Sequence, residues 1–525
     1  MKILLLLAAF LAVMPGSDRT GAILTITGAV SLEDLDEQTV ERFESLASHP
    51  LKLNLCGRSR LLSSGLLTEY QAASLLDYRS RTGDIMSWSE LSLVDGFSPA
   101  LAKALQEFCS LESSSAPGIP ESRKASHDLM VRAAVKGDGH TKPDYSYGAK
   151  YNFLLGERLE VNWGSRTTYS DSRFTPGTAS VAYYGKDRIG KIVAGDFNAR
   201  YGQGLLQWSG FSMSSYSSVT AMMRKGTGIS ASRSFTRSLH GIGADFDLGR
   251  WSVSGAWSWP GTALAHLGWN GRRLSLGAGA KAGDGTAFSL DWQAGTASLC
   301  FYGEGCWSPA DGPALTSGLV WSPAYGVKTA ALCKLNSKGT QTVAGFQNKW
   351  LSTTFDAIWN NSYKVTLMAK PCFEAGPFTL TPALRVKAAH KPGDKNPTRI
   401  EARAEGSVSW NEWMLSGRYE RVWCQGASWL WYAEGGYRSD LSAYLRFSLF
   451  KIDAWPDRIY VYERDAPGNF NVPAYYGRGL SASAVVSCKF RKQCLHLRAS
   501  TVQYLWNLSD KSPKLELKIQ YQLKL

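Results

Sequence analysis

The sequence predicts a mainly β fold, in which a small all-α domain precedes a large antiparallel transmembrane β-barrel. Two observations carry this prediction. Long strand-like segments with one apolar and one polar face recur from about residue 127 to residue 525. Short segments with helical periodicity and helix-capping residues occupy residues 23–112. The expected barrel has an even number of strands, about 16 to 22 at roughly 20 residues per strand and turn.

Residues 514–525 carry the clearest strand pattern. Leu515, Leu517 and Ile519 begin a series of apolar side chains at odd positions, and the even positions hold only Lys, Glu and Gln. Successive strand side chains point to opposite faces, so this segment has one wholly apolar face. A tilted strand needs about 9 to 11 residues to cross a bilayer, and this segment is long enough.

The same alternation recurs upstream at residues 413–423, 429–437 and 441–449, with aromatic residues near the segment ends. Such segments are typical of transmembrane barrels with aromatic girdles. Further strand-like segments lie at residues 145–154, 159–168, 191–199, 251–259, 274–281, 287–294, 327–335 and 378–388. Residues 202–237 and 453–476 interrupt the alternation, which predicts two long loops, either folded into the lumen or standing outside the cell.

The first residues predict a secretory signal peptide. Lys2 precedes the short apolar run of residues 3–14, and small residues suit cleavage between Gly16 and Ala22. No later run reaches 18 apolar residues, the length that a spanning helix needs. Secretion, amphipathic strands and the absence of such a run together predict a Gram-negative outer-membrane protein.

Composition agrees with a membrane barrel. The chain has 19 Trp, 23 Tyr and 51 Gly, and only 19% of its residues are charged, against about 25% in soluble proteins. The nine cysteines are an odd number and cannot all pair within one chain. Cys56 and Cys109 bracket the helical domain and are a candidate pair, whereas the other cysteines support no assignment.

The helical domain shows capped, short helices. Residues 31–48 have helical periodicity with acids near the start, and a second helix follows Thr68 and ends at Gly83. Ser87 and Glu90 have capping-box spacing, and Pro99 opens a last helix. Residues 113–126 form a linker rich in Ser and Pro.

The helical domain resembles a known module. Leu53-Asn54, Gly65-Leu66-Leu67, residues 76–79, residues 89–91 and residues 94–97 are similar to the tandem helix-hairpin-helix module of bacterial competence DNA receptors, which also occurs fused to an outer-membrane barrel in Bacteroidetes proteins. The resemblance implies a fold and a nucleic-acid interface. Its residues here are Lys52, Arg58, Arg60, Gly65, Arg79, Arg81, Gly96 and Lys103.

The hairpins depart from the DNA-binding form, which reads Gly-apolar-Gly. Leu67 and Ser98 stand where that form has its second glycine, so close approach of the backbone to a phosphate is in question. Residues 195–205, 458–463 and 472–479 also look like recurrent segments of the same Bacteroidetes barrel family. The resemblance implies no established activity.

The helical domain and the barrel differ in net charge. Residues 23–115 hold 7 Lys and Arg against 13 Asp and Glu, and residues 116–525 hold 49 against 30, so the basic excess belongs to the barrel. Residues 203–237 contain no acid. This loop is a candidate anion-binding segment, and the alternative is a loop whose cations pair with lumen carboxylates. Its four cations are Arg224, Lys225, Arg233 and Arg237.

The sequence predicts no catalytic residues, no metal site and no cofactor. The seven histidines lack the spacing of a zinc motif, and no Cys-x-x-Cys, Gly-x-Ser-x-Gly, Walker or Rossmann motif occurs. We therefore expect a protein that is not an enzyme, with an outer-membrane hydrolase as a remote alternative.

Two functional hypotheses follow from the sequence. In the first, the barrel is a receptor or channel for nucleic acid, and the helical domain lies in the periplasm. In the second, the barrel anchors a helical domain that docks a periplasmic or other envelope protein. Outer-membrane lipid is a partner in both hypotheses, and the oligomeric state is left open.

Overall fold

The computed structural model describes residues 19–525 except for short segments. The segments outside the description are 29–34, 36, 114–124, 139–141, 157, 171–172, 174–176, 186–187, 210–215, 217, 225, 234, 236–238, 272, 297, 325, 361, 391–397, 468, 470 and 506–511. The hydrophobic part of the expected signal peptide, residues 3–14, lies outside the described residues.

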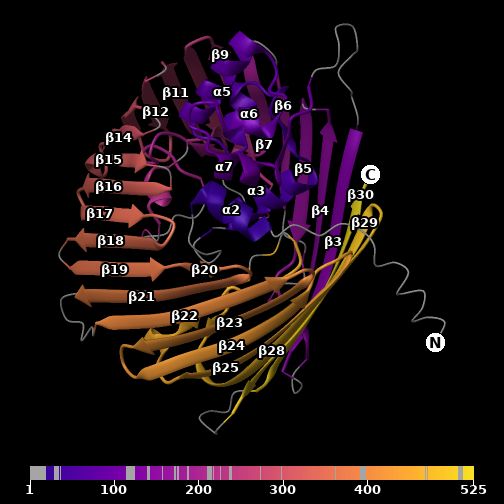
Figure 1. The fold of residues 1–525 in the computed structure, drawn as a ribbon. Coiled ribbons are helices and arrows are strands. Elements are labelled where there is room, and N and C mark those ends of the chain that lie inside the picture. The colour runs from indigo at the N-terminus through magenta and orange to yellow at the C-terminus, as the bar shows by residue number, and fades with distance from the viewer. Residues whose placement is uncertain are drawn as a thin grey trace.

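A closed antiparallel barrel dominates the fold (Figure 1). The described residues form 24 barrel strands, so the fold class and the even number are confirmed, while the count exceeds the expected 16 to 22. The count was too low because most strands have only 8 to 13 residues and are joined by short turns.

The barrel strands have the following bounds: β3 (Ala125–Gly137), β4 (Asp144–Leu155), β5 (Leu159–Arg166), β6 (Thr178–Tyr184), β7 (Ile189–Arg200), β9 (Leu239–Leu248), β10 (Trp251–Ser258), β11 (Thr262–Asn270), β12 (Leu274–Ala282), β13 (Ala287–Gly295), β14 (Leu299–Ser308), β15 (Gly312–Ala324), β16 (Val327–Asn336), β17 (Gly339–Gln347), β18 (Leu351–Trp359), β19 (Tyr363–Pro371), β21 (Phe378–His390), β22 (Arg399–Trp410), β23 (Trp413–Trp423), β24 (Ala427–Tyr437), β25 (Leu441–Ile452), β28 (Gly477–Phe490), β29 (Gln493–Tyr504) and β30 (Lys514–Lys524). The short strand β20 (Phe373–Ala375) continues β19 along β21.

Strands β3 and β30 close the barrel, with Asp128 opposite Lys524. The first barrel strand therefore starts at the same end of the barrel where the chain finishes, and we call this the terminal end. Connections at the terminal end are two to four residues long. At the opposite end, the loop end, five connections have eight residues or more, including residues 201–238 and 453–476.

The outer surface of the barrel is apolar. Leu290 and Leu445, each 64% exposed, belong to a belt of exposed aliphatic and aromatic side chains around the strands. Exposed tryptophans lie near both ends of the strands, as in the two girdles of transmembrane barrels. They include Trp257, Trp307, Trp359 and Trp423 near the loop end and Trp251, Trp321, Trp410 and Trp413 near the terminal end.

The helical domain has its own hydrophobic core, which includes Phe43, Leu75 and Phe108. Its helices are α2 (Arg19–Thr27), α3 (Glu37–Ser48), α4 (Arg58–Ser63), α5 (Glu69–Thr82), α6 (Trp88–Leu91) and α7 (Pro99–Leu105), and β1 (Leu51–Lys52) pairs in parallel with β2 (Cys109–Ser110). The proposed cleavage region overlaps the start of α2. No helix among the described residues is long and apolar enough to span a bilayer.

The complete capping box lies at Thr68 and not at Ser87. The Thr68 hydroxyl accepts the Gln71 N–H, and the Gln71 side chain accepts the Thr68 N–H. Ser87 does cap the N–H of Glu90, but the Glu90 carboxylate accepts the N–H of Met86. This bond is the main cause that lowers the pKa of Glu90.

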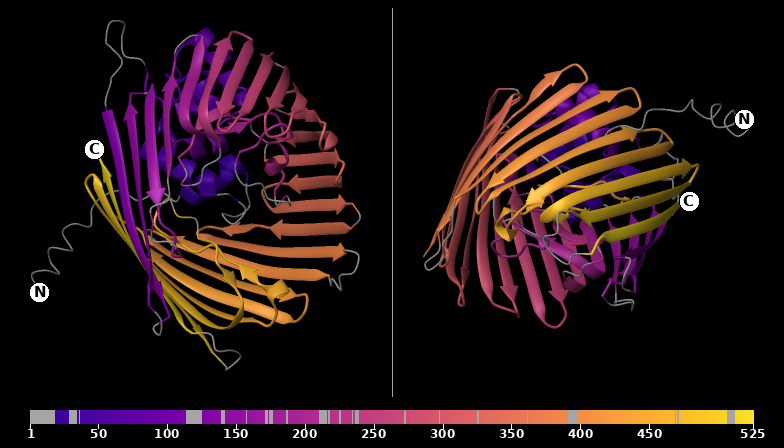
Figure 2. Two further views of the ribbon diagram at one scale, coloured as in Figure 1. Left: turned by 180° about the vertical axis from the view of Figure 1, so that it is seen from behind. Right: turned by 90° about the horizontal axis from the view of Figure 1, so that it is seen from below.

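The helical domain lies inside the ring of strands, against the wall formed by strands β5 to β11 (Figures 1 and 2). Helix α4 contacts β7, β9 and the inner strand β8 (Gly228–Ala231), which pairs with β7. The described parts of both long loops also fold inward onto wall residues, which is one of the two outcomes expected for residues 202–237 and 453–476. The second loop contains β26 (Ile459–Tyr460) and β27 (Ala474–Tyr475).

Candidate functional site

Helix α4 presents a polar face to the barrel wall at the terminal end. The Arg58 guanidinium donates to the side-chain oxygen of Asn270 at 2.7 Å and lies 3.7 Å from the Asp247 carboxylate. The Ser59 hydroxyl donates to Asp247 at 2.8 Å. Asp247 and Asn270 end strands β9 and β11 at the terminal rim, so the module is held there by hydrogen bonds and charge.

Glu160 is the centre of a second contact. Its carboxylate is almost fully buried and lies 3.1 Å from Nη1 of Arg60 and 2.6 Å from Nε of Arg233. Arg60 also stacks over the ring of Tyr184, 4.1 Å from the centroid. Arg233 donates to the hydroxyl of Ser45 in α3 at 2.8 Å. One wall carboxylate thus joins the helical domain and the inner loop after β8.

His49 marks the junction between the helical domain and the first barrel strand. Its Nε2 lies 2.7 Å from the hydroxyl of Ser126 in β3, and its buried Nδ1 has no hydrogen-bond partner among the described residues. Burial lowers the pKa of His49, because the charged ring would lose water and the opposing effect of Asp128 is smaller. The neutral ring therefore suits this position.

The other residues that the resemblance implied for nucleic acid lie apart from this face. Arg79 donates to backbone oxygens of the domain, including those of Leu53 and Cys56, and Lys52 pairs with Glu112. Arg81 pairs with Asp77 on the same exposed helix face, and Lys103 is exposed on α7.

The glycines of the two expected hairpins both have positive φ, Gly65 at 68° and Gly96 at 88°. Helices α4 and α5 flank the first glycine, and helices α6 and α7 flank the second. A Cβ at Gly65 would lie 2.0 Å from the Arg42 guanidinium, so this turn also serves close packing within the domain.

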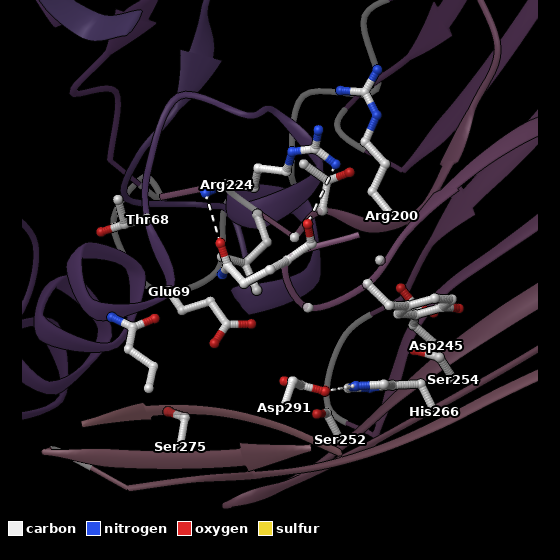
Figure 3. A pocket seen from close by; sticks show the side chains of 18 of the residues that line it. Thr68, Glu69, Arg200, Arg224, Asp245, Ser252, Ser254, His266, Ser275 and Asp291 are labelled. Carbon is white, nitrogen blue, oxygen red and sulfur yellow. Dashed lines mark hydrogen bonds and ion pairs between the residues drawn. The ribbon is translucent and has the colours of Figure 1, made fainter. Parts of the chain in front are cut away.

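A cavity of about 90 Å³ separates the helical domain from the inner loop and the wall (Figure 3). Arg58 and Glu69 reach it from the helical domain, and Arg200 and Arg224 reach it from β7 and the following loop. On the wall side, His266 bonds to Asp291 at 2.8 Å. Charged or polar side chains therefore reach the cavity from the helical domain, the loop and the wall, which suits water or a small polar solute.

The first inner loop is held by wall carboxylates. Glu304, fully buried on β14, accepts the backbone N–H groups of Gln203, Leu205 and Leu206 at 2.7 to 2.9 Å. Asp356 on β18 accepts the N–H of Tyr216 at 3.2 Å. Barrel carboxylates therefore satisfy backbone donors that the irregular loop leaves without partners.

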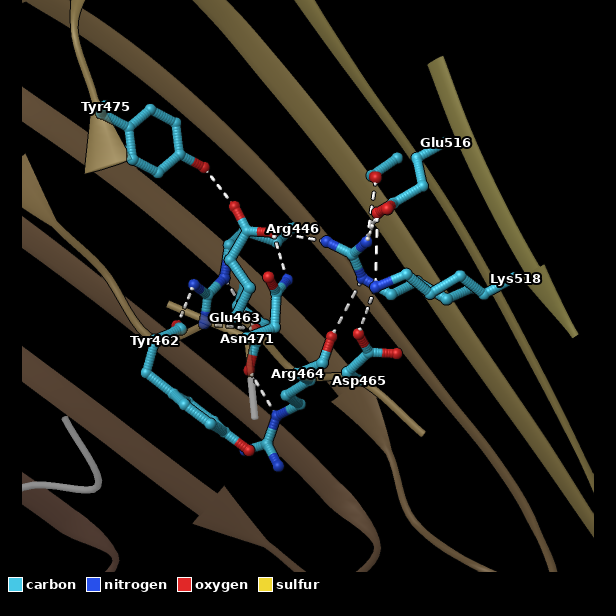
Figure 4. Close-up of polar contacts among 12 residues, drawn as sticks. Arg446, Tyr462, Glu463, Arg464, Asp465, Asn471, Tyr475, Glu516 and Lys518 are labelled. Carbon is cyan, nitrogen blue, oxygen red and sulfur yellow. Dashed lines mark hydrogen bonds and ion pairs between the residues drawn. The ribbon is translucent and has the colours of Figure 1, made fainter. Parts of the chain in front are cut away.

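The second inner loop is held by a network of ion pairs (Figure 4). Glu463 accepts from Arg498 at 2.5 Å and from the hydroxyl of Tyr475. Asp465 accepts from Lys518 at 2.7 Å. The remaining contacts include Arg446 and Arg464 on Glu434, Arg446 on the Tyr462 carbonyl, Asn471 on Glu463 and Arg498 on Glu516.

The four cations of the predicted anion-binding loop do not share one site among the described residues. Arg224 contacts the backbone oxygen of Gln203 and stacks over Trp208, and Arg233 binds Glu160. Lys225 and Arg237 lie outside the described residues. Arg233 therefore pairs with a lumen carboxylate, as the alternative hypothesis for this loop expected.

Sequence reasoning missed the wall acids Glu160, Asp247 and Glu304 and the loop acid Glu463. Glu160 and Glu304 stand on the inward parity of their strands, next to Asn162 and Tyr302, so alternation places them in the lumen. No local sequence pattern indicates whether they contact the helical domain or an inner loop. Among the described residues no cluster suits a metal ion. The nine cysteines carry free thiols, so the candidate pair Cys56 and Cys109 is not a disulfide in this structure.

No family model and no curated protein matches this sequence. Among solved structures, the chain is similar to the P pilus usher (PapC) translocation pore, with 10% identity, a TM-score of 0.41 and coverage of 76% of this chain and 99% of that chain. It is also similar to Pseudomonas aeruginosa OpdQ, with 10% identity, a TM-score of 0.33 and coverage of 76% and 97%. For OccK1 (OpdK) from the same organism the values are 9%, 0.32, 76% and 98%. Likenesses this distant assign no activity.

Proposed function

We propose that the protein is an outer-membrane channel whose lumen is closed by the helical domain and the two inner loops. The observation that carries this proposal is a wide closed barrel with an apolar outer belt and a polar lumen. The helical domain and the two inner loops, which we call the inserts, fill this lumen. Barrels of this size enclose a channel or a plugged lumen, because side chains of the wall alone cannot fill them. Movement of these inserts would therefore control whether solutes pass through the lumen.

The proposed orientation puts the terminal end in the periplasm. Transmembrane barrels of the outer membrane have short periplasmic turns and longer extracellular loops, and the two ends of this barrel differ in that way. The helical domain would then enter the lumen from the periplasm, and the loops of residues 201–238 and 453–476 would enter from outside.

The helical domain is suited to act as a removable plug. It carries its own core, and the hydrogen bonds and ion pairs by which α4 meets the wall run through Arg58, Ser59 and Arg60. Water can replace such contacts when the domain leaves, whereas a large apolar interface would resist release. We therefore expect a closed state with rare openings.

Charge reversal at α4 tests the plug. In the variant R58E/R60E, carboxylates would face Asp247 and Glu160, so the helical domain should leave the wall. The purified variant in planar bilayers should show more frequent or larger conductance steps than the wild type. R81E is the matched control, because the ion pair of Arg81 with Asp77 lies within α5. Equal conductance of R58E/R60E and wild type would contradict the plug.

Placement is tested separately from gating. The protein should fractionate with the outer membrane and migrate faster on gels before heating than after it, because a closed barrel stays folded in detergent. Protease added to intact cells should spare residues 23–112. Recovery in the soluble periplasm, or cleavage of the helical domain from outside, would overturn the membrane placement or the orientation.

Nucleic-acid handling is a second candidate function, favoured by the use of Arg58, Ser59 and Arg60 as one anion-binding face. In the closed barrel this face binds carboxylates, so a phosphate backbone would have to compete with Asp247 and Glu160. Titration of the protein with duplex DNA at physiological salt checks this candidate. Submicromolar binding that R58E/R60E abolishes supports it, and binding no tighter than about 10⁻⁴ to 10⁻⁶ M leaves only non-specific contact.

If DNA does not bind, the alternative is a helical domain that docks another envelope protein. Its exposed side carries the apolar residues Met86 and Leu93, 77% and 82% exposed. Crosslinking in intact cells from a photoreactive group at Leu93 would capture such a protein, and capture of nothing beyond the barrel itself would remove this alternative.

A further inference from the structure

The lumen wall from β16 to β22 is strongly basic. Side chains of these strands that share the inward parity include eight cations and four carboxylates. The cations are Lys328, Lys334, Lys364, Lys370, Arg385, Lys387, Arg399 and Arg403, and the acids are Asp356, Glu374, Glu401 and Glu405. The parity follows from the cross-strand partners, such as Thr366 with Lys387 and Met368 with Arg385.

Two of the acids on this wall, Glu401 and Asp356, are already engaged. Glu401 binds two guanidinium groups, that of Arg385 at 3.2 Å and that of Arg399 at 2.6 Å. Asp356 accepts from the inner loop and from Gln341. The wall therefore keeps a positive excess after its internal ion pairs are formed.

Two lysines stand out on this wall. Lys328 on β16 and Lys387 on β21 make no hydrogen bond or ion pair with any residue that the structure describes. Lys328 is exposed to the lumen and Lys387 is half-buried. An ammonium group in a concave wall that is not directly paired with a carboxylate favours anions in the adjacent water.

The inserts do not neutralise this wall as they do elsewhere. On the wall from β23 to β30, Arg498 and Lys518 meet the loop acids Glu463 and Asp465. The loop that faces β16 adds a further cation, Arg224, and residues 203–237 contain no acid. The uncompensated charge thus lies on one side of the lumen.

We propose that this wall makes the channel selective for small anions, with inorganic phosphate as the simplest test solute. The proposal rests on the proposed channel function and adds its solute class. Rings or stripes of Lys and Arg select anions because they raise the local anion concentration and repel cations. Lys328 and Lys387 carry the selectivity, since their charges are not consumed by structural ion pairs.

Selectivity is measured as the reversal potential in a KCl gradient across a planar bilayer, in the R58E/R60E background. That background should prefer chloride over potassium, and adding K328Q/K387Q should lower the preference about twofold or more. K338Q/K349Q is the matched control, because Lys338 and Lys349 lie in turns outside the wall strands. Cation preference, or no change in K328Q/K387Q, would overturn the selectivity and leave the channel standing.

A second readout does not need an open channel. Small amine-reactive reagents should label Lys328 and Lys387 of the wild-type chain more slowly in phosphate than in chloride at equal ionic strength, while Lys338 should show no difference. Protection without conductance would overturn the channel and retain the anion site. If phosphate does not protect the two lysines and the channel shows no preference for anions, the inference is overturned.

Discussion

The guanidinium group of Arg60 on helix α4 lies 3.1 Å from the carboxylate of Glu160 on strand β5. The two residues come from different domains, and both are largely shielded from water. Arg233 binds the other carboxylate oxygen. The carboxylate offsets the charges of both guanidinium groups, so its loss would leave two largely buried cations without a counter-charge.

Glu160→Gln should therefore loosen the helical domain. Breaking a buried ion pair by removal of one partner costs about 3 to 5 kcal/mol, so the undocked population should rise roughly a hundredfold or more. The readout is the fraction of time that single channels spend open. Glu374→Gln is the control, since this exposed carboxylate has no hydrogen-bond partner among the described residues. Equal open fractions in both variants would contradict the prediction.

Local patterns predicted much of the fold. The alternation of residues 413–423 and 514–525 yields strands β23 and β30 almost residue for residue, because each face of these strands meets a single environment, lipid or lumen. The helices that end at Gly83 and begin at Pro99 also lie as expected. These features depend on neighbours in sequence, which periodicity reports directly.

The lumen contacts could not be predicted in the same way. Arg58 and Asp247 meet only after the barrel closes, and nothing in either segment identifies the other. Basic residues on a short helix fit a phosphate interface as well as a contact with wall carboxylates, because both partners are anionic. The strand number was underestimated for a simpler reason: turns such as residues 424–426 are shorter than the assumed average.

Asn54→Ala should destabilise the helical domain from within. The buried Asn54 amide accepts the N–H of Ile85 and donates to the carbonyl oxygens of Ile85 and Leu111. Loss of these bonds leaves buried polar groups unsatisfied, at about 1 to 3 kcal/mol. Amide exchange at Ile85 in the full chain should speed up accordingly. Ser80→Ala, which removes an exposed hydroxyl, should leave that exchange unchanged.

Glu463→Gln should weaken the second inner loop. Its buried carboxylate accepts from Arg498, Tyr475 and Asn471, so the neutral amide leaves the Arg498 charge partly uncompensated. A loss of about 3 to 5 kcal/mol is expected locally. The temperature at which the folded gel band disappears should fall by several degrees. The exposed Glu412, changed to Gln, should have no such effect; an equal shift in both variants would contradict the prediction.

Acid should open the channel through His49. Burial lowers the pKa of His49 in the docked state below its usual value of about 6.5, so the undocked state binds the proton more tightly. Docking is therefore at full strength above about pH 6.5 and weakens as the pH falls below it. Protonation would also place an N–H at the buried Nδ1, which has no acceptor among the described residues.

Conductance recorded between about pH 7.5 and pH 5 tests this link. The wild type should open more often as the pH falls, and His49→Gln, which is neutral throughout, should flatten that part of the response. Nearby charges act in opposite directions, since Asp128 raises the pKa of His49 and Lys524 lowers it. Lys524→Gln should therefore weaken the acid response, because the docked state would tolerate the charged ring better once the repulsion from Lys524 is gone. An acid response that survives unchanged in His49→Gln would assign the proton to another group.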